Sequence, residues 1–146
     1  MREQPKTEST AAPREAHRRL PGRPADARRA VLSAVAEGCR ARAVPCDADA
    51  LEDALLVVSE LTTNAMLHGG GLTGFDVDVD ADAHGVRVSV CDRSRELPVA
   101  APPVDDQGRS RVGGRGWRIV CLLARDVQVA GLPCGGKRIT AVVPLG

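Results

Sequence analysis

The sequence predicts an α/β fold: a two-layer α/β sandwich in which a mostly antiparallel mixed sheet carries helices on one face. Two observations lead to this prediction. Two long segments with apolar residues at helical spacing come first, and later segments alternate apolar and polar residues with the period of a strand. A further helical segment separates two pairs of these strands, which gives the order ααββαββ.

The chain divides into a tail and one domain. Residues 1–15 are polar, contain two prolines and show no periodicity, so we expect a disordered N-terminal tail. Residues 16–146 are long enough for a single hydrophobic core and are predicted to form one domain. Within it, His17 to Leu20 is a candidate for a short edge strand.

The first helix is predicted from Pro24, which suits a first helical turn, to about Arg42. The second opens at Asp47 or Asp49, and Asp49 with Glu52 has the spacing of a capping box. It runs to about residue 67, where three glycines stop it. Its predicted core-facing stripe consists of Leu51, Ala54, Leu55, Val58, Leu61, Thr62 and Ala65.

The strands are predicted at 75–80 and 86–90, joined by a short turn, and at 127–130 and 139–143, joined through Pro133 to Gly136. The third helix is predicted from Trp117 to Arg125, entered through two glycines.

Between the second strand and this helix lies a segment rich in proline, glycine and charge. We interpret residues 99–114 as either a functional lid or a disordered linker.

Composition excludes several classes of function. The net charge is +1, and the chain has one Phe and one Trp, which disfavours nucleic-acid binding. Neither a membrane-spanning run nor a signal peptide is visible, so a cytoplasmic protein that does not bind membranes is expected. The five cysteines are odd in number and form no C-x-x-C pair, which predicts reduced thiols.

The second helix also carries the first candidate site. Glu60, Asn64 and His68 fall on one line of a face beside the apolar stripe. A carboxylate can accept a proton, and an amide oxygen can hold a hard cation such as Mg²⁺. For an isolated pair of this kind, a solvated helix face is the ordinary explanation. His68 is explained equally well as a polar cap on the end of the helix.

Three other features could carry chemistry. Asp92 ends a valine-rich strand, so its carboxylate is expected at the sheet edge, although a turn aspartate is the common alternative. Gly114 and Gly116 precede the third helix, where free backbone N–H groups suit a phosphate. Lys137 follows two glycines in the last hairpin, where most glycines are plain turn residues.

In this order the features resemble the N box and the three glycine boxes of the GHKL ATP-binding domains. The sequence VVSELTTNAMLHG is similar to the "SELVTNAxxHA" of small anti-sigma-factor serine/threonine kinases of high-GC bacteria. VSVCDRSRELP is similar to their "VxDxSxxxP", and GGRGWRIV to their "GGRGLxIV". The resemblance covers roughly residues 16–146 and implies the Bergerat (GHKL) ATPase fold. Two departures stand out: no glycines follow the strand-end aspartate, and the last box has Lys137 where the family usually has Thr.

The resemblance implies ATP and Mg²⁺ as cofactors and assigns roles to individual residues. Asn64 would be the metal ligand, and Asp92 would accept from the adenine amino group, which selects ATP over GTP. Glu60 would be the catalytic residue that orients or deprotonates the attacking hydroxyl. The remaining expected cofactor-binding residues are His68, Arg109, Gly114, Arg115, Gly116 and Lys137.

Three functions are compatible with this reading. The leading one is a protein serine/threonine kinase that acts as an anti-sigma regulator. Its implied partners are an anti-anti-sigma factor, which accepts the phosphate on a serine, and a sigma factor held by a homodimer. The second is an ATP-binding regulatory module without phosphoryl transfer. The third is a detached histidine-kinase-like catalytic domain, which the lack of a preceding phospho-acceptor region disfavours.

Overall fold

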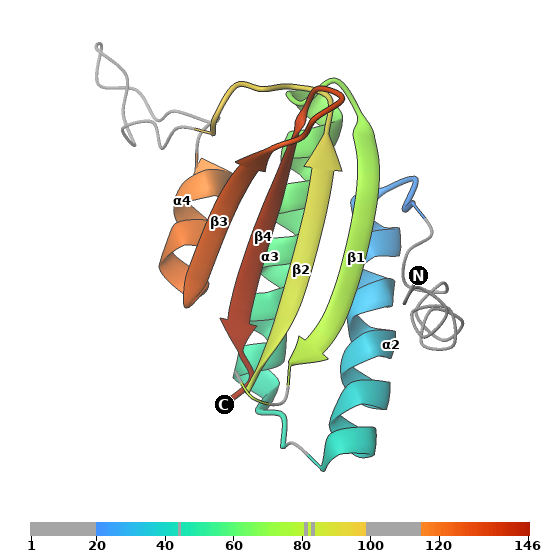
Figure 1. The fold of residues 1–146 in the computed structure, drawn as a ribbon. Coiled ribbons are helices and arrows are strands. Elements are labelled where there is room, and N and C mark those ends of the chain that lie inside the picture. The colour runs from blue at the N-terminus through green and yellow to red at the C-terminus, as the bar shows by residue number, and fades with distance from the viewer. Residues whose placement is uncertain (1–19, 44, 81, 83, 99–114) are drawn as a thin grey trace, which may run out of the picture.

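The computed structural model describes residues 20–43, 45–80, 82, 84–98 and 115–146. The elements follow the predicted order ααββαββ (Figure 1). They are α2 (Pro24–Arg42), α3 (Ala48–Leu67), β1 (Leu72–Asp80), β2 (Gly85–Asp92), α4 (Arg115–Leu123), β3 (Asp126–Gly131) and β4 (Lys137–Pro144). The predicted tail, the predicted lid and residues 17–19 of the candidate edge strand lie outside the described residues; Leu20 is not in a strand.

The four strands form one sheet in the order β1-β2-β4-β3, and each neighbouring pair is antiparallel. The helices α2, α3 and α4 all lie behind this sheet in Figure 1, so they cover one of its faces. The predicted α/β sandwich is confirmed. On the other face, polar side chains pair across strands: Arg87 bonds Asp80 at 2.7 Å, and the hydroxyls of Ser89 and Thr140 lie 3.1 Å apart.

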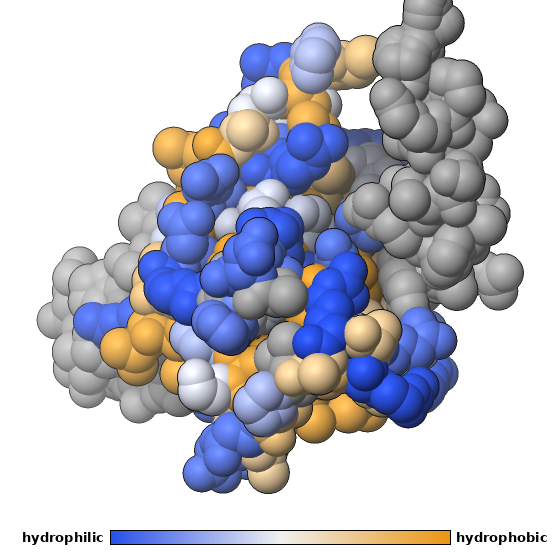
Figure 2. All heavy atoms as spheres, turned by 60° about the horizontal axis from the view of Figure 1, so that its bottom comes forward, coloured by the Kyte–Doolittle hydropathy of each residue, from blue (hydrophilic) through white to orange (hydrophobic). Residues whose placement is uncertain are grey.

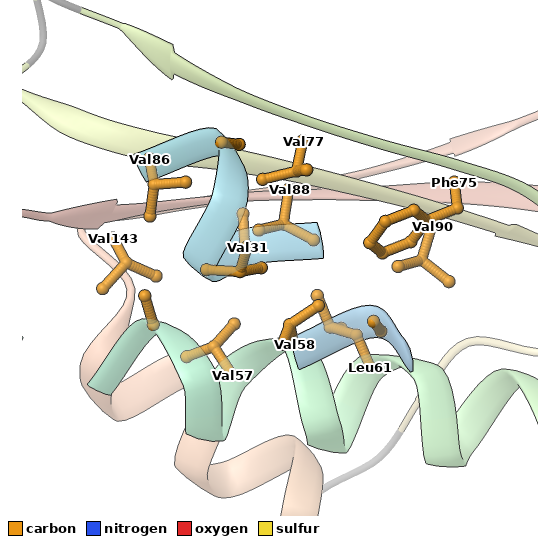
Figure 3. Packing of buried hydrophobic residues seen from close by; sticks show 14 of the residues in the cluster. Val31, Val57, Val58, Leu61, Phe75, Val77, Val86, Val88, Val90 and Val143 are labelled. Carbon is orange, nitrogen blue, oxygen red and sulfur yellow. The ribbon is translucent and has the colours of Figure 1, made fainter. Parts of the chain in front are cut away.

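The core lies between the two layers and is built mainly from valine. Figure 3 shows side chains of the inner sheet face meeting Val31 of α2 and Val57, Val58 and Leu61 of α3. Burial of each such side chain stabilises the fold by about 1.5–3 kcal/mol relative to exposure. The predicted stripe of α3 is buried or partly buried, and Val57, which the prediction omitted, is fully buried beside it.

The sequence offered Asp47 and Asp49 as alternative N-caps of α3, and the structure distinguishes them. Asp47 is the N-cap, and its carboxylate accepts from the N–H of Ala50 at 3.2 Å. The predicted capping box of Asp49 and Glu52 is wrong. In a capping box an acidic side chain satisfies the N–H of the cap residue, but here the Leu145 carbonyl accepts from the Asp47 N–H at 3.0 Å.

The boundaries of α4 differ from the prediction by two residues at each end. The helix begins at Arg115, so Gly116 lies inside its first turn and does not precede it. It ends at Leu123, because the chain then joins the sheet: the N–H of Arg125 donates to the Val142 carbonyl at 2.8 Å.

The structure also bears on two expectations from composition, the one about membrane-spanning segments and the one about the cysteines. None of the described helices is long and apolar enough to cross a bilayer. All five cysteines lie in the described part of the chain and have free thiols.

Candidate functional site

The segments that carry the described site residues meet toward the upper end of the sandwich in Figure 1. There the C-terminal half of α3, the glycines after it, the end of β2 and the start of β4 meet. The Arg93 N–H, just after β2, donates to the Gly69 carbonyl, just after α3, at 2.9 Å. Asp92 and Lys137 are direct cross-strand partners in the sheet. This end of the sheet therefore joins segments that are far apart in the sequence.

Strand alternation places Asp92 on the inner face of the sheet. Val86, Val88 and Val90 point into the core, and Asp92 continues the same row one step beyond it. The residue is 5% exposed. Its Oδ1 accepts from the backbone N–H of Ser94 at 2.9 Å, which fixes the carboxylate at the strand end. The predicted position of Asp92 at the edge above the core is therefore observed.

Lys137 belongs to the same buried cluster. Its Nζ lies 3.0 Å from both carboxylate oxygens of Asp92 and donates to the Ser94 carbonyl at 3.3 Å. The lysine is 6% exposed. A charge this deeply buried requires a partner of opposite charge and further hydrogen bonds, and this arrangement supplies both. Sequence reasoning assigned Lys137 to cofactor binding and did not foresee the ion pair.

Two glycines leave room for the Asp92 carboxylate and backbone. A Cβ on Gly69 would lie 2.5 Å from Oδ2 of Asp92. Gly136 has φ +87°, and a Cβ there would overlap the carbonyl oxygen of Asp92. The sequence pattern predicts a helix stop at Gly69 and a turn at Gly136. Their close approach to one acidic side chain was missed, because neither glycine adjoins Asp92 in the sequence.

Glu60 faces a different neighbour. It is partly buried, and its carboxylate lies so close to Gly116 that a side chain at that position would overlap Oε1. Gly116 lies in the first turn of α4, where the backbone N–H groups have no partner within the helix and the helix dipole is positive. The carboxylate of Glu60 is thus placed at the positive end of α4.

Asn64 lies one turn after Glu60 on α3 and is partly buried. Within the described part of the chain, its side-chain amide has no hydrogen-bond partner. His68 is the C-cap of α3; its N–H donates to the Asn64 carbonyl at 2.8 Å, and its side chain is exposed. The backbone of His68 therefore caps α3, and the role of its exposed side chain stays a prediction.

The structure leaves part of the prediction undescribed. Arg109 and Gly114 lie outside the described residues, and Arg115 is placed only as the first residue of α4. The predicted contacts of these three residues with a cofactor remain predictions.

Mg²⁺ fits the donors present only together with a polyphosphate. Glu60 and Asn64 offer hard oxygen atoms one helical turn apart. The described residues contain no group of three or more His, Cys, Asp or Glu side chains able to hold a metal. Since Mg²⁺ prefers six oxygen ligands, phosphate and water oxygens would have to supply most of them.

Two surface hollows lie away from this cluster. One, of about 490 Å³, opens on the outer sheet face beside Arg87, Arg138 and Thr140. The other, of about 310 Å³, lies near Cys46 and His84 at the opposite end of the sandwich. Figure 2 turns that end forward and shows hydrophilic residues interspersed with hydrophobic ones. Neither hollow is lined by a predicted site residue. The candidate site is therefore identified by the chemistry of its side chains and not by the volume of a surface hollow.

Comparison with known proteins gives one family. The profile of the histidine kinase-like ATPase domain matches residues 20–142. Among solved structures, the histidine kinase domain of the blue-light activated histidine kinase from Erythrobacter litoralis is similar at 19% sequence identity with a TM-score of 0.46. That similarity covers 81% of this chain and 60% of the other. No curated protein sequence matches significantly.

Proposed function

Because the chain belongs to the histidine kinase-like ATPase domain family, we propose that it binds Mg-ATP and transfers a phosphoryl group to a serine or threonine of a partner protein. One observation carries this proposal. Glu60 and Asn64 lie one turn apart on α3, and Glu60 is held against the first turn of α4. A potential base, a metal ligand and the N–H groups of a helix N-terminus thus lie together.

Each of these groups has a part in phosphoryl transfer, which depends mostly on positioning and on charge stabilisation. The free N–H groups in the first turn of α4 suit the phosphates. The Asn64 amide would hold Mg²⁺, which neutralises charge on the phosphate oxygens. Glu60 would orient the acceptor hydroxyl and take its proton. Asp92 lies beside Gly69, just beyond the C-terminal end of α3, where it would face the base of the nucleotide.

The partners follow from the sequence resemblance. The N box and the box at Gly114 to Gly116 are similar to those of small anti-sigma-factor kinases. We therefore propose an anti-anti-sigma factor as the phosphate acceptor and a sigma factor as the protein held, with the chain acting as a homodimer in the cytoplasm.

A second function is favoured by one specific contact. The ammonium of Lys137 is bonded to both oxygens of Asp92, which is the group expected to recognise adenine. Such a contact opposes tight nucleotide binding. Weak binding disfavours efficient turnover of ATP, so the second candidate is a regulatory module that responds to nucleotide without transferring phosphate.

The two functions are separated by one experiment. The purified chain is used to capture proteins from its host extract with and without Mg-ATP, and phosphorylated sites on the captured proteins are mapped. New phosphoserine or phosphothreonine on a captured protein supports the kinase. Nucleotide-dependent capture without phosphate supports the passive module, and phosphohistidine supports a histidine-kinase-like domain. Capture that is independent of nucleotide and leaves no newly phosphorylated site refutes all three.

A further inference from the structure

The strongest feature outside the family pattern is the position of Lys137. Core-facing residues alternate along β4 as Lys137, Ile139, Ala141 and Val143, and Lys137 is directly opposite Asp92 in the register. Three protein oxygens surround its ammonium at 3.0, 3.0 and 3.3 Å. Since an ammonium has three N–H donors, each donor has an acceptor within the protein. The side chain is therefore held in place and does not extend into solvent.

This contact uses much of the acceptor capacity of Asp92. Oδ1 receives hydrogen bonds from Lys137 and from the Ser94 N–H, and Oδ2 receives one from Lys137. The carboxylate is also neutralised by the adjacent positive charge. An adenine amino group that donates to Asp92 would have to compete with a donor that carries a full positive charge, whereas the amino group itself is neutral.

We propose that Lys137 is a specificity-determining residue that weakens the recognition of adenine by Asp92 and narrows the preference for ATP over GTP. This inference depends on the proposed nucleotide-binding function. Guanine presents a carbonyl where adenine presents an amino group, and a carbonyl cannot accept a hydrogen bond from the carboxylate of Asp92. The three donors of Lys137 are already bonded within the protein, so none is free for a guanine carbonyl. The ion pair therefore lowers the affinity for ATP without raising the affinity for GTP.

The test compares the parent chain with Lys137→Thr, using calorimetric affinities for Mg-ATP and Mg-GTP. Removing the competing donor should tighten ATP binding by about tenfold, the equivalent of one hydrogen bond to a charged group. GTP binding should not tighten, so the ATP/GTP preference rises by a similar factor. Arg138→Thr is the matched control, because it removes the same charge from the next residue, which is exposed on the outer face. It should leave the preference unchanged.

Each outcome decides the matter. A folded Lys137→Thr variant with unchanged or weaker ATP binding overturns the inference but leaves the proposed function intact. If loss of the buried ion pair prevents folding, the parent alone is decisive: a preference for ATP below about tenfold is expected, and a larger preference refutes the role of Lys137. If the parent binds neither nucleotide, the proposed function itself fails.

Discussion

The carboxylate of Glu60 lies against the backbone of Gly116, so a residue in the fourth turn of α3 contacts the first turn of α4. This contact is possible only because residue 116 has no side chain. The two helices pack against each other here, and the acidic group is placed where the free N–H groups of α4 begin. The absence of a side chain at Gly116 therefore admits the carboxylate of Glu60.

A first prediction follows for Gly116→Ala. The new Cβ would overlap Oε1 of Glu60 and lie 3.1 Å from its Cδ, so the flexible carboxylate must move away. Alanine favours a helix over glycine by about 1 kcal/mol, which offsets much of the packing loss. We expect a midpoint of thermal unfolding within a few degrees of the parent, but phosphoryl transfer reduced at least about tenfold. Normal transfer would show that the position of Glu60 is unimportant.

Gly69→Ala is predicted to act on stability. Its Cβ would lie 2.5–2.8 Å from three atoms of the Asp92 side chain, which is held by hydrogen bonds and cannot easily move. Overpacking of this kind costs about 1–3 kcal/mol in the free energy of unfolding. Gly131→Ala is the control, because a Cβ there meets nothing within 4 Å. Equal denaturation midpoints for the two variants would contradict the close approach of Gly69 to Asp92.

A third prediction concerns Asn64. A neutral amide is a useful Mg²⁺ ligand only when a triphosphate supplies the charge, so Asn64→Ala should weaken Mg-ATP binding by more than about tenfold and leave the fold intact. The neighbouring Thr63→Ala variant, on a different line of the same helix, should bind as the parent does. Calorimetry with and without Mg²⁺ measures both. An unchanged affinity of Asn64→Ala for Mg-ATP would show that Asn64 is not a Mg²⁺ ligand and would contradict the resemblance of this segment to the N box.

The buried pair of Asp92 and Lys137 can be measured by a double-mutant cycle. Removing one partner leaves the other charge buried and unpaired, which costs about 3–5 kcal/mol in related cases. Asp92→Asn and Lys137→Met should each destabilise the chain strongly, and the double variant should lose clearly less than the sum of the two. Urea unfolding provides the three values. Additive effects would mean that the two charges do not interact in solution.

This pair also shows how far the sequence could predict the site. Alternation with a period of two placed Asp92 at the end of its strand, and helical periodicity placed Glu60 and Asn64 on one face. The partner of Asp92 depends on the register between β2 and β4, which are separated by more than forty residues and are not joined by a hairpin. No local pattern specifies such a register, so the position of Lys137 beside Asp92 could not be predicted.

The contact between Glu60 and Gly116 could not be predicted from the sequence for a related reason. Residues 68–114, which include β1 and β2, separate the two helices in the sequence. Helix packing over such a distance depends on tertiary geometry, which periodicity does not contain. In addition, the apolar run starting at Trp117 indicated a helix start two residues late, so Gly116 was expected before the helix. Local patterns therefore predicted which residues share a face, while the contacts between faces required the structure.

The last prediction distinguishes a kinase from a passive nucleotide-binding module, and it depends on Glu60. The carboxylate lies at the positive end of α4, so it suits a base beside a phosphate but adds negative charge next to a polyphosphate. Glu60→Gln should therefore bind Mg-ATP as well as the parent or slightly better. It should nevertheless lose transfer to the captured partner by about 10²–10⁴-fold, the usual contribution of a general base.

Glu52→Gln makes the same charge change at an exposed position of α3 and should leave both properties unchanged. If Glu60→Gln and the parent transfer phosphate at the same rate, Glu60 is not the base; if the parent transfers none, the passive module replaces the kinase.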